Sequence, residues 1–599
     1  MKNAQNRLTV LAASVAALAM SMSMSATAAT QGPADNSFYD APAAMPSGNP
    51  GTLVSYRSTK VNLGANTTAH SAWNVTYKST DAVDVENIVS GTVIVPSAAW
   101  SGTGPRPVVV YAVGTHGLGN QCAPSRQMAA GTDYEANNIN AALAKGYAVL
   151  VSDYEGYLNG GLPTYLAGRS QAHAVLDMVR AAQQLNGAGI TTASKVGVWG
   201  FSQGGQTSAW AAEVQKSYAP ELNIVGFAAG GIPADFIKAA YFLDGSFGAA
   251  FLASGVSGLK TQYPDQLPVD LIASDSGLAA LEKLQGQCVF EALLDLQNKS
   301  LSAFTKNNFG LDQILKVGGV KQTMLDQNLG TTTPAAPMYL FHGQADEFID
   351  ISQTTTLKNT YCASNKQVKF DLYPSEHIVT MTQGAGPALA WMADRFNGVA
   401  AQGNCSVTTV PASTSATTKG GDLIVNLDKW KLDAKIHLKT LNQDVILPDT
   451  STLSVVSNIS KNSMTGSMNV PDFKSRVSII GINAQVGIRV TPVDKVTGQT
   501  SLDAAGQLTI TGTAKTDITV TTVWGVPFGE CKTVTPVIFP LSYKGSVGDL
   551  GAGKVTFTGT ADFPQIKGCF ISGIISAMMS TKGNPFTFTI APPAPKSTY

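Results

Sequence analysis

Short apolar runs alternate with longer amphipathic stretches between residues 106 and 396 of the 599-residue chain. A brief apolar run bounded by turn residues is typical of a buried strand, and apolar side chains that recur every three or four positions are typical of a helix. These patterns predict strands at residues 106–113, 147–151, 195–199, 224–228, 338–341 and 368–373. Between and after them they predict helices at residues 133–145, 165–185, 203–215 and 385–396.

Strands that alternate with helices form a mostly parallel sheet covered on both faces, which is the α/β class. Residues 53–96 show alternating patterns instead and predict antiparallel strands at one edge of the sheet. The interval 234–329 breaks the alternation, because it is mostly helical and unusually apolar. We interpret it as an inserted helical cap that shapes a binding pocket; the alternative is ordinary helical packing on the sheet.

The character of the sequence changes after residue 406. Residues 407–421 are rich in serine and threonine and predict a linker. Residues 422–599 contain short alternating runs of Thr, Val and Ile separated by Gly, Asp and Pro. These runs predict an antiparallel β-sandwich-like domain, with a barrel-like arrangement as the alternative. The first domain is therefore expected to span residues 31–406. The second domain is open to two interpretations: it binds a surface or polymer, or it binds nothing.

The N-terminus has the pattern of a secretory signal peptide over residues 1–28. Lys2 and Arg7 precede a largely apolar core, and the tripeptide ATA at positions 26–28 is a suitable cleavage site. A membrane anchor is the alternative, but the core is short and interrupted by serines. No later stretch is apolar enough to span a bilayer, so we expect a secreted, extracellular protein.

Charge and motifs exclude several classes of function. Lys plus Arg and Asp plus Glu each number 40, which gives no support for nucleic-acid binding. No G-x-G-x-x-G opens a helix after a strand, and no Cys/His cluster has the spacing of zinc ligands, so we expect no cofactor and no metal. Asp346, Glu347 and Asp350 are interpreted as loop acids rather than as metal ligands.

The six cysteines favour disulfides, since an even number is typical of an exported protein. Cys531 and Cys569 both lie in the second domain and are expected to pair with each other. The remaining four lie in the first domain and allow three connectivities: Cys122, Cys288, Cys362 and Cys405.

The pentapeptide GFSQG at positions 200–204 stands where a predicted strand meets a predicted helix. This is the context of a nucleophile elbow, in which the glycines permit a sharp turn and the serine hydroxyl projects from it. The following helix directs backbone N–H groups and a positive dipole end at the same place. Ser202 is therefore a candidate nucleophile, and the fold is expected to be the α/β-hydrolase arrangement. The alternative is a glycine-rich turn that merely contains a serine.

A nucleophilic serine needs an oriented base, and in this arrangement the chain order is serine, acid, histidine. His377 follows the last predicted strand, where the final catalytic loop belongs, and is assigned as the base. Asp346 follows the strand at 338–341 and is assigned as the acid. His437 lies in the second domain, and His342 is interpreted as structural. The rival carboxylates are Glu347, Asp350 and Glu376, of which Asp350 is the credible substitute.

The oxyanion formed by attack on a carbonyl needs at least two hydrogen-bond donors. One is expected from the backbone N–H of Gln203, the residue after the nucleophile. The glycine-rich loop 114–119 follows an early predicted strand and should supply another, with Thr115 and His116 as the candidates. For His116 the alternative is a solvent-facing loop residue.

Four stretches of the chain together resemble the secretory lipase family, typified by Candida antarctica lipase A. They are FY at 38–39 with NPGTL at 49–53 and YR at 56–57, GT at 114–115 running to CAPS at 122–125, YEG at 154–156, and GFSQGG at 200–205. The similarity covers residues 38–405. It implies an α/β-hydrolase core, a helical cap and a triad that falls on Ser202, Asp346 and His377.

The same resemblance implies the disulfides Cys122–Cys288 and Cys362–Cys405. One departure concerns the oxyanion loop, because lipase A is associated with an acidic residue where this chain has THG at 115–117. The second domain lies outside the resemblance.

These observations predict a secreted carboxylic ester hydrolase, a lipase that acts on acyl esters or lipids through an acyl-enzyme. A serine peptidase of the prolyl-oligopeptidase type is the first alternative; it would need a propeller or an amine-binding acid pair, and neither is evident. The second alternative is a non-catalytic cell-surface binding protein, which the complete Ser/Asp/His set disfavours.

Overall fold

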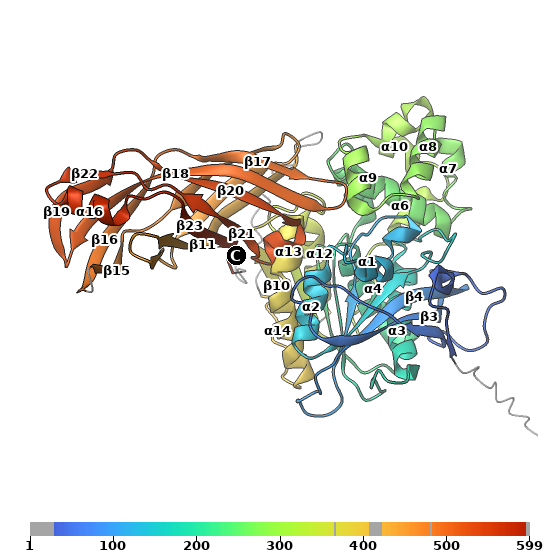
Figure 1. Cartoon of the computed structure of the whole chain (residues 1–599). Helices are drawn as coiled ribbons and strands as arrows, with labels where there is room; N and C mark the ends of the chain where they lie inside the picture. Colours follow the sequence, from blue (N-terminus) through green and yellow to red (C-terminus); the bar gives the residue numbers. More distant parts are fainter. Residues whose placement is uncertain (1–28, 365–366, 407–421, 480–481, 595–599) are drawn as a thin grey trace, which may run out of the picture.

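The computed structural model describes residues 29–364, 367–406, 422–479 and 482–594. The predicted signal peptide (1–28) and the predicted linker (407–421) lie outside the described residues. The described chain forms an α/β part followed by a part made almost entirely of strands, which stand side by side in Figure 1. The change of architecture falls between α14 (Ala385–Phe396) and β11 (Ile424–Leu438).

Among the described residues, ten strands form the sheet of the α/β part, in the order β1-β2-β3-β4-β6-β5-β7-β8-β9-β10. The strands β2 to β4 pair antiparallel, as their alternating sequence predicts, and β5 to β10 are parallel. Their bounds are β1 (Thr30–Gln31), β2 (Leu53–Ser58), β3 (His70–Thr80), β4 (Glu86–Pro96), β5 (Val108–Ala112), β6 (Ala148–Tyr154), β7 (Val196–Phe201), β8 (Ile224–Gly230), β9 (Met338–Gly343) and β10 (Val368–Tyr373).

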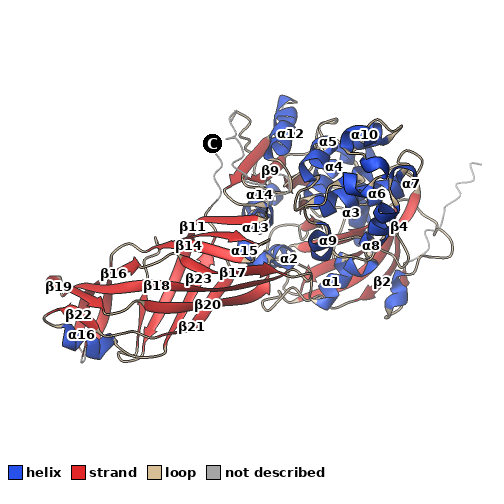
Figure 2. Ribbon diagram, turned by 90° about the horizontal axis from the view of Figure 1, so that it is seen from above, coloured by secondary structure: helices blue, strands red, loops and turns tan. Residues whose placement is uncertain are grey.

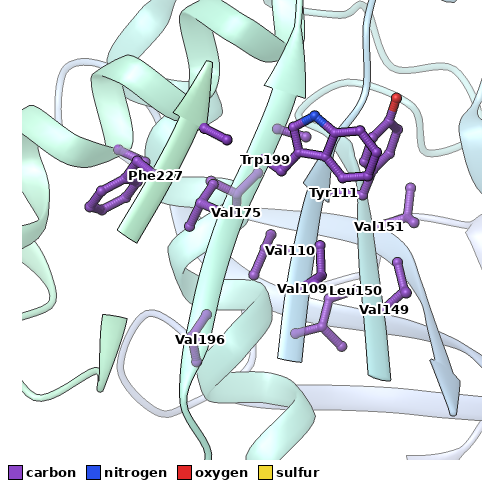
Figure 3. Close-up of a cluster of buried hydrophobic side chains, with 14 of the residues drawn as sticks. Val109, Val110, Tyr111, Val149, Leu150, Val151, Val175, Val196, Trp199 and Phe227 are labelled. Atoms are coloured by element: carbon purple, nitrogen blue, oxygen red, sulfur yellow. The ribbon is translucent and has the colours of Figure 1, made fainter. Parts of the chain in front are cut away.

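The centre of this sheet is apolar on both faces. Every residue of β5 and β6 is buried, as expected of parallel strands covered on both sides. Figure 3 shows the valines of these strands beneath Tyr111 and Trp199, whose rings pack edge to face with centroids 4.8 Å apart. Such a packed centre fixes the loops that leave the carboxyl ends of the strands, where sites in open α/β sheets are built.

Helices cover both faces of the sheet. On one face α3 (Gly168–Gln184) packs on α4 (Gln203–Tyr218), and on the other α2 (Ala136–Ala144) packs on α14. The apolar spacing predicted these helices to within a few residues. It did not predict α1 (Pro124–Ala130), α12 (Ile351–Ala363) or α13 (His377–Gln383).

Seven α-helices lie between β8 and β9 in the described chain, inside the interval interpreted as a cap. They stand at the upper right of the molecule in Figure 1. Their bounds are α5 (Phe236–Leu243), α6 (Ala249–Gln262), α7 (Val269–Ile272), α8 (Asp275–Leu284), α9 (Val289–Leu296), α10 (Leu311–Ile314) and α11 (Val320–Leu325).

The C-terminal part is an antiparallel sheet of thirteen described strands. It is one continuous sheet that curls, since β20 comes back into contact with β21. The predicted antiparallel domain is present as a single elongated roll, which Figure 2 shows projecting from the α/β part. Alternation alone reports that one face is buried, and it does not report how the sheet closes.

The remaining strands of the roll, after β11, are β12 (Gln443–Ile446), β13 (Thr452–Asn458), β14 (Ser463–Asn469), β15 (Phe473–Ile479), β16 (Ile482–Pro492), β17 (Val496–Leu502), β18 (Gln507–Val523), β19 (Val526–Thr533), β20 (Val537–Ser546), β21 (Val555–Ala561), β22 (Ile566–Cys569) and β23 (Asn584–Ala591). Two short helices accompany them, α15 (Gly548–Gly551) and α16 (Ser572–Met579).

Three disulfides join the cysteines as Cys122–Cys288, Cys362–Cys405 and Cys531–Cys569. The first two are the pairs that the resemblance implies, and the third is the pair expected within the second domain. Disulfides persist in oxidising environments, which fits an exported protein. Among the described residues, no helix combines the length and the apolar character needed to cross a bilayer.

Candidate active site

Ser202 stands in the sharp turn between β7 and α4. Its φ of +59° lies in a region that residues with a side chain rarely adopt, as in a strained nucleophile elbow. The glycines around it are required by close backbone contacts. A methyl group on Gly200 would lie 2.5 Å from the carbonyl oxygen of Ala112, and one on Gly204 would meet the same oxygen. The motif therefore permits a fit between strand and helix that bulkier residues would prevent.

His377 begins α13, immediately after the loop that follows β10, and Asp346 lies on the loop after β9. The Nδ1 of His377 is 2.7 Å from Oδ2 of Asp346. The other carboxylate oxygen, Oδ1, accepts the backbone N–H groups of Phe348 and Ile349, at 3.0 and 2.8 Å. These contacts fix the carboxylate, which in turn orients the imidazole and leaves Nε2 as its second ring nitrogen.

Ser202 and His377 line one cavity, together with Thr115 from the loop after β5. Two phenyl rings hold the imidazole in place: the ring of Phe201 lies 4.6 Å and that of Phe348 5.3 Å from it, centroid to centroid. The structure thus brings serine, histidine and aspartate to one edge of the sheet from three separate loops.

The charged forms of His377 and Asp346 stabilise each other. Burial lowers the pKa of His377, but the charge and hydrogen bond of Asp346 outweigh burial and leave the pKa above its usual value. Burial likewise raises the pKa of Asp346, yet the neighbouring His377 reverses that effect and holds the pKa below its usual value. Asp346 therefore remains ionised beside an imidazole whose pKa is higher than that of a free one.

The rival acids have other partners. Glu347 accepts the backbone N–H of His377 at 3.0 Å, and Glu376 accepts that of Val379 as the N-cap of α13. Asp350 caps α12 through the N–H of Ser352. Each rival carboxylate therefore satisfies helix or loop N–H groups, while Asp346 contacts the imidazole.

His342 is fully buried and contacts the hydroxyl of Thr354 through Nδ1 and the carbonyl of Ile349 through Nε2. Its Nε2 also lies 3.4 Å from Oδ2 of Asp346. These contacts agree with a structural residue that supports the loop after β9.

The candidate oxyanion donors differ in their position relative to Ser202. Gln203 is the first residue of α4, where backbone N–H groups have no partner within the helix. Thr115 lines the cavity of Ser202, and its hydroxyl is 2.7 Å from that of Tyr165. In the described structure His116 does not line this cavity; its ring contacts the carbonyl of Gly114 and the carboxylate of Asp133 instead. Burial lowers the pKa of His116, but Asp133 outweighs burial and raises it to about 9.

Glu135, which no sequence pattern singled out, lines the same cavity. Its carboxylate accepts the backbone N–H of Gly114 at 2.8 Å and the hydroxyl of Tyr111 at 3.2 Å. Burial raises its pKa to about 7. The residue precedes α2 and belongs to no motif, so no sequence signal pointed to it; it supports the loop that carries Thr115.

Comparison with known proteins now decides the family. The family model described as Secretory lipase matches residues 123–404. A protein of Mycobacterium tuberculosis (strain CDC 1551 / Oshkosh) named Probable inactive lipase MT1628 is 32% identical, over 61% of this chain and 83% of that protein. The chain belongs to the secretory lipase family. The predictions of that family and of a carboxylic ester hydrolase are thereby confirmed.

Two further proteins are similar to this secretory lipase. The Secreted triacylglycerol lipase LIP7 of Malassezia globosa is 28% identical, over 61% of this chain and 79% of that protein. The X-ray structure of Candida antarctica lipase A is 26% identical with a TM-score of 0.56, over 64% of this chain and 92% of that chain. The α/β-hydrolase fold is confirmed by this likeness.

An apolar cavity of about 150 Å³ adjoins Ser202 in this secretory lipase. Helices of the insertion supply most of its wall, with Phe236, Phe251, Val256 and Leu259 among the lining side chains. Such a wall can hold an alkyl chain, because burying methylene groups is favourable and apolar side chains need no hydrogen-bond partner.

The C-terminal roll of the secretory lipase packs directly on α13, the helix that begins at His377. Its helix α15 contacts α13, and Asp549 accepts a hydrogen bond from Asn137 at 3.0 Å. A methyl group added to Gly551 would lie 2.5 Å from the carbonyl oxygen of Val379 and would also meet Thr382. The second domain therefore supports the helix that positions the imidazole.

This contact predicts that Gly551→Ala impairs hydrolysis of a soluble ester. The added methyl pushes α15 from α13, and a displacement of His377 by a fraction of an ångström lowers kcat by about 10-fold. The matched control is Gly573→Ala, since a methyl at Gly573 meets nothing within 4 Å. Equal kcat values for both variants and the parent would show that the contact does not position the histidine.

Proposed function

We propose that this secretory lipase hydrolyses carboxylic esters of fatty acids, with Ser202 as nucleophile, His377 as general base and Asp346 as the orienting acid. The observation that carries the proposal is the 2.7 Å contact between His377 Nδ1 and Asp346 Oδ2, beside a serine held at φ +59° in the same cavity. Esters of long-chain acids are the favoured substrates because the cavity beside Ser202 is apolar.

In the first half of the reaction, Oγ of Ser202 attacks the ester carbonyl while Nε2 of His377 accepts the serine proton. Asp346 stabilises the imidazolium that forms. Collapse of the tetrahedral intermediate transfers that proton to the leaving alcohol and leaves an acyl-enzyme. In the second half, water gives a proton to His377 and attacks the acyl carbonyl, and the return of the proton to Oγ releases the acid.

The oxyanion is stabilised by the backbone N–H of Gln203 and by the loop at Thr115. The position of Gln203 at the N-terminus of α4 supports the first assignment, because the helix dipole and its unpaired N–H groups favour negative charge there. The place of Thr115 in the wall of the Ser202 cavity supports the second.

An assay of p-nitrophenyl esters of graded chain length, beside a peptide amide, tests this function. We expect kcat/KM to rise from the acetyl to the decanoyl ester and the amide to remain uncleaved. Cleavage of the amide would favour a serine peptidase, and turnover of no ester would favour a non-catalytic binding protein. The mycobacterial relative is named a probable inactive lipase.

Filling the apolar cavity should shorten the preferred chain. Val256→Trp places an indole among the helices of the insertion and removes room for two or three methylene groups, each contributing ~0.8 kcal/mol. We expect kcat/KM for the decanoyl ester to fall by about 10- to 50-fold while that for the acetyl ester is kept. Leu271→Trp is the control, because Leu271 is exposed and does not line the cavity. A parallel loss with both esters would place the acyl chain elsewhere.

Export of the protein after removal of residues 1–28 is part of the same proposal, as is the division into domains at 31–406 and 422–599. Relatives named as secreted lipases and the three disulfides support an extracellular location.

A further inference from the structure

The end of the C-terminal roll that lies far from the α/β part contains an apolar cavity. Figure 1 shows α16, β19 and β22 at this end. The cavity has a volume of about 220 Å³, whereas the cavity beside Ser202 has about 150 Å³. All fifteen of its lining residues are apolar, and they come from β11, β16 and β18 and from α16, among other segments. Protein interiors are close-packed, so a void of this size is a departure that a ligand would explain.

This distal cavity is separate from the cavities near the α/β part. Strand β11 lines a smaller cavity near α13 with Leu427 and the distal cavity with Leu438. Between these positions, β11 pairs with the part of β23 that carries Phe586 and Phe588. Their rings pack on that of Phe539, with centroids 5.3 and 5.1 Å apart. The two cavities share no lining residue, and these rings lie opposite the part of β11 between them.

The wall of the distal cavity continues onto the surface of the molecule. Trp524 and Ile574 both line the cavity, yet they are 57% and 63% exposed. Phe570 is 80% exposed, and its ring meets that of Phe528, another lining residue, at 5.3 Å. Large apolar side chains this exposed around one opening mark a site of contact with something apolar.

Trp524 also occupies an unusual backbone position. It forms with Gly525 the two-residue turn between β18 and β19, and their φ values are +50° and +80°. Turns of this kind favour Asn-Gly, because a bulky residue with positive φ is strained. The indole N–H donates to the carbonyl oxygen of Asn483 at 3.3 Å, which holds the ring at the rim. A strained tryptophan presented to solvent points to a role for its side chain.

The chemistry of the site selects an alkyl chain as its occupant. A wall without polar side chains cannot satisfy the hydrogen bonds of a polar ligand. Two of the charged side chains on nearby strands are ion-paired, Arg489 with Asp472 and Lys532 with Asp517. Exposed tryptophan and phenylalanine are the side chains that enter the boundary of a lipid layer.

We propose that the distal end of the C-terminal domain docks on a lipid layer, with Trp524, Phe570 and Ile574 in the layer and one alkyl chain of a lipid in the distal cavity. The site lies outside the candidate active site and does not depend on the assignment of the triad.

Flotation of the full chain with vesicles of ether-linked phosphatidylcholine tests docking, because ether lipids contain no ester to hydrolyse. We expect Trp524→Asn combined with Phe570→Gln to lower the vesicle partition coefficient at least about 10-fold. Asn-Gly is the favoured turn sequence, so this variant keeps its fold, and its turnover of a soluble ester should match the parent. The control Val456→Asn removes an exposed apolar residue, 46% exposed, from β13 and should bind like the parent. Equal partition of the rim variant and the parent would overturn the proposal.

A second variant tests the cavity itself. Ile575→Trp fills the distal cavity while leaving Trp524 and Phe570 exposed. We expect it to weaken vesicle binding about 5-fold, which corresponds to losing the burial of about one methylene group. Far-UV circular dichroism and turnover of a soluble ester check its fold. Parent-like vesicle binding by a folded Ile575→Trp would show that no chain enters the cavity and would overturn that part of the proposal.

Discussion

Ser202→Ala is expected to lower kcat for p-nitrophenyl esters by about a million-fold, because no other group can form the acyl-enzyme. The substitution removes one oxygen from a buried turn and leaves the contacts of Gly200 and Gly204 intact, so the melting temperature should stay close to that of the parent. Steady-state turnover and labelling by a fluorophosphonate, which reacts with activated serines, measure the effect.

The control for this prediction is Ser208→Ala in the same helix. The hydroxyl of Ser208 is buried and donates to the carbonyl oxygen of Val198 at 3.3 Å, outside the candidate active site. We expect that variant to keep its turnover and its label. Turnover that survives in Ser202→Ala would remove the serine from the mechanism, and an unlabelled, inactive parent would assign the protein to the inert class.

Asp346→Asn is expected to lower kcat by about 10⁴-fold. The amide keeps an oxygen for the N–H groups of Phe348 and Ile349, so the loop can retain its shape. It cannot carry charge, and its NH₂ group favours the wrong tautomer of His377. Asp350→Asn is the matched control, since that side chain caps α12 and an asparagine caps a helix equally well.

The same variant should change the pH profile. His377 acts as a base only when neutral, so activity falls as the pH drops through its pKa. Asp346 raises that pKa. Without the carboxylate the pKa falls, and the acid limb of kcat/KM should move to lower pH in Asp346→Asn. If the acid limb of kcat/KM does not move, or if kcat falls by less than about 10-fold, the orienting role would belong to a neighbour such as Glu347.

Local patterns predicted those features that depend on neighbours along the chain. The turn at Ser202 follows from glycines flanking it between a strand and a helix, and the places of Asp346 and His377 follow from the ends of two apolar strands. Helix α13 was not predicted, because its first turn overlaps the catalytic loop. Its capping residue, Glu376, was interpreted as a rival acid.

Features that depend on distant parts of the chain could not be predicted. Glu135 reaches the N–H of Gly114 from the start of another helix, and no spacing rule connects the two. The contact of Gly551 with α13 joins segments about 170 positions apart. Alternation in the second domain likewise gave antiparallel strands without the curl that makes them a roll.

The Cys122–Cys288 disulfide joins two segments that supply wall residues to the cavity of Ser202. It joins the loop after β5 to the start of α9, and backbone hydrogen bonds from Leu118 to Gln287 and from Val289 to His116 reinforce the junction. The crosslink restricts movement of the start of α9 relative to the loop after β5. The crosslink therefore holds the α9 side of the cavity that Ser202 lines against the loop that carries Thr115.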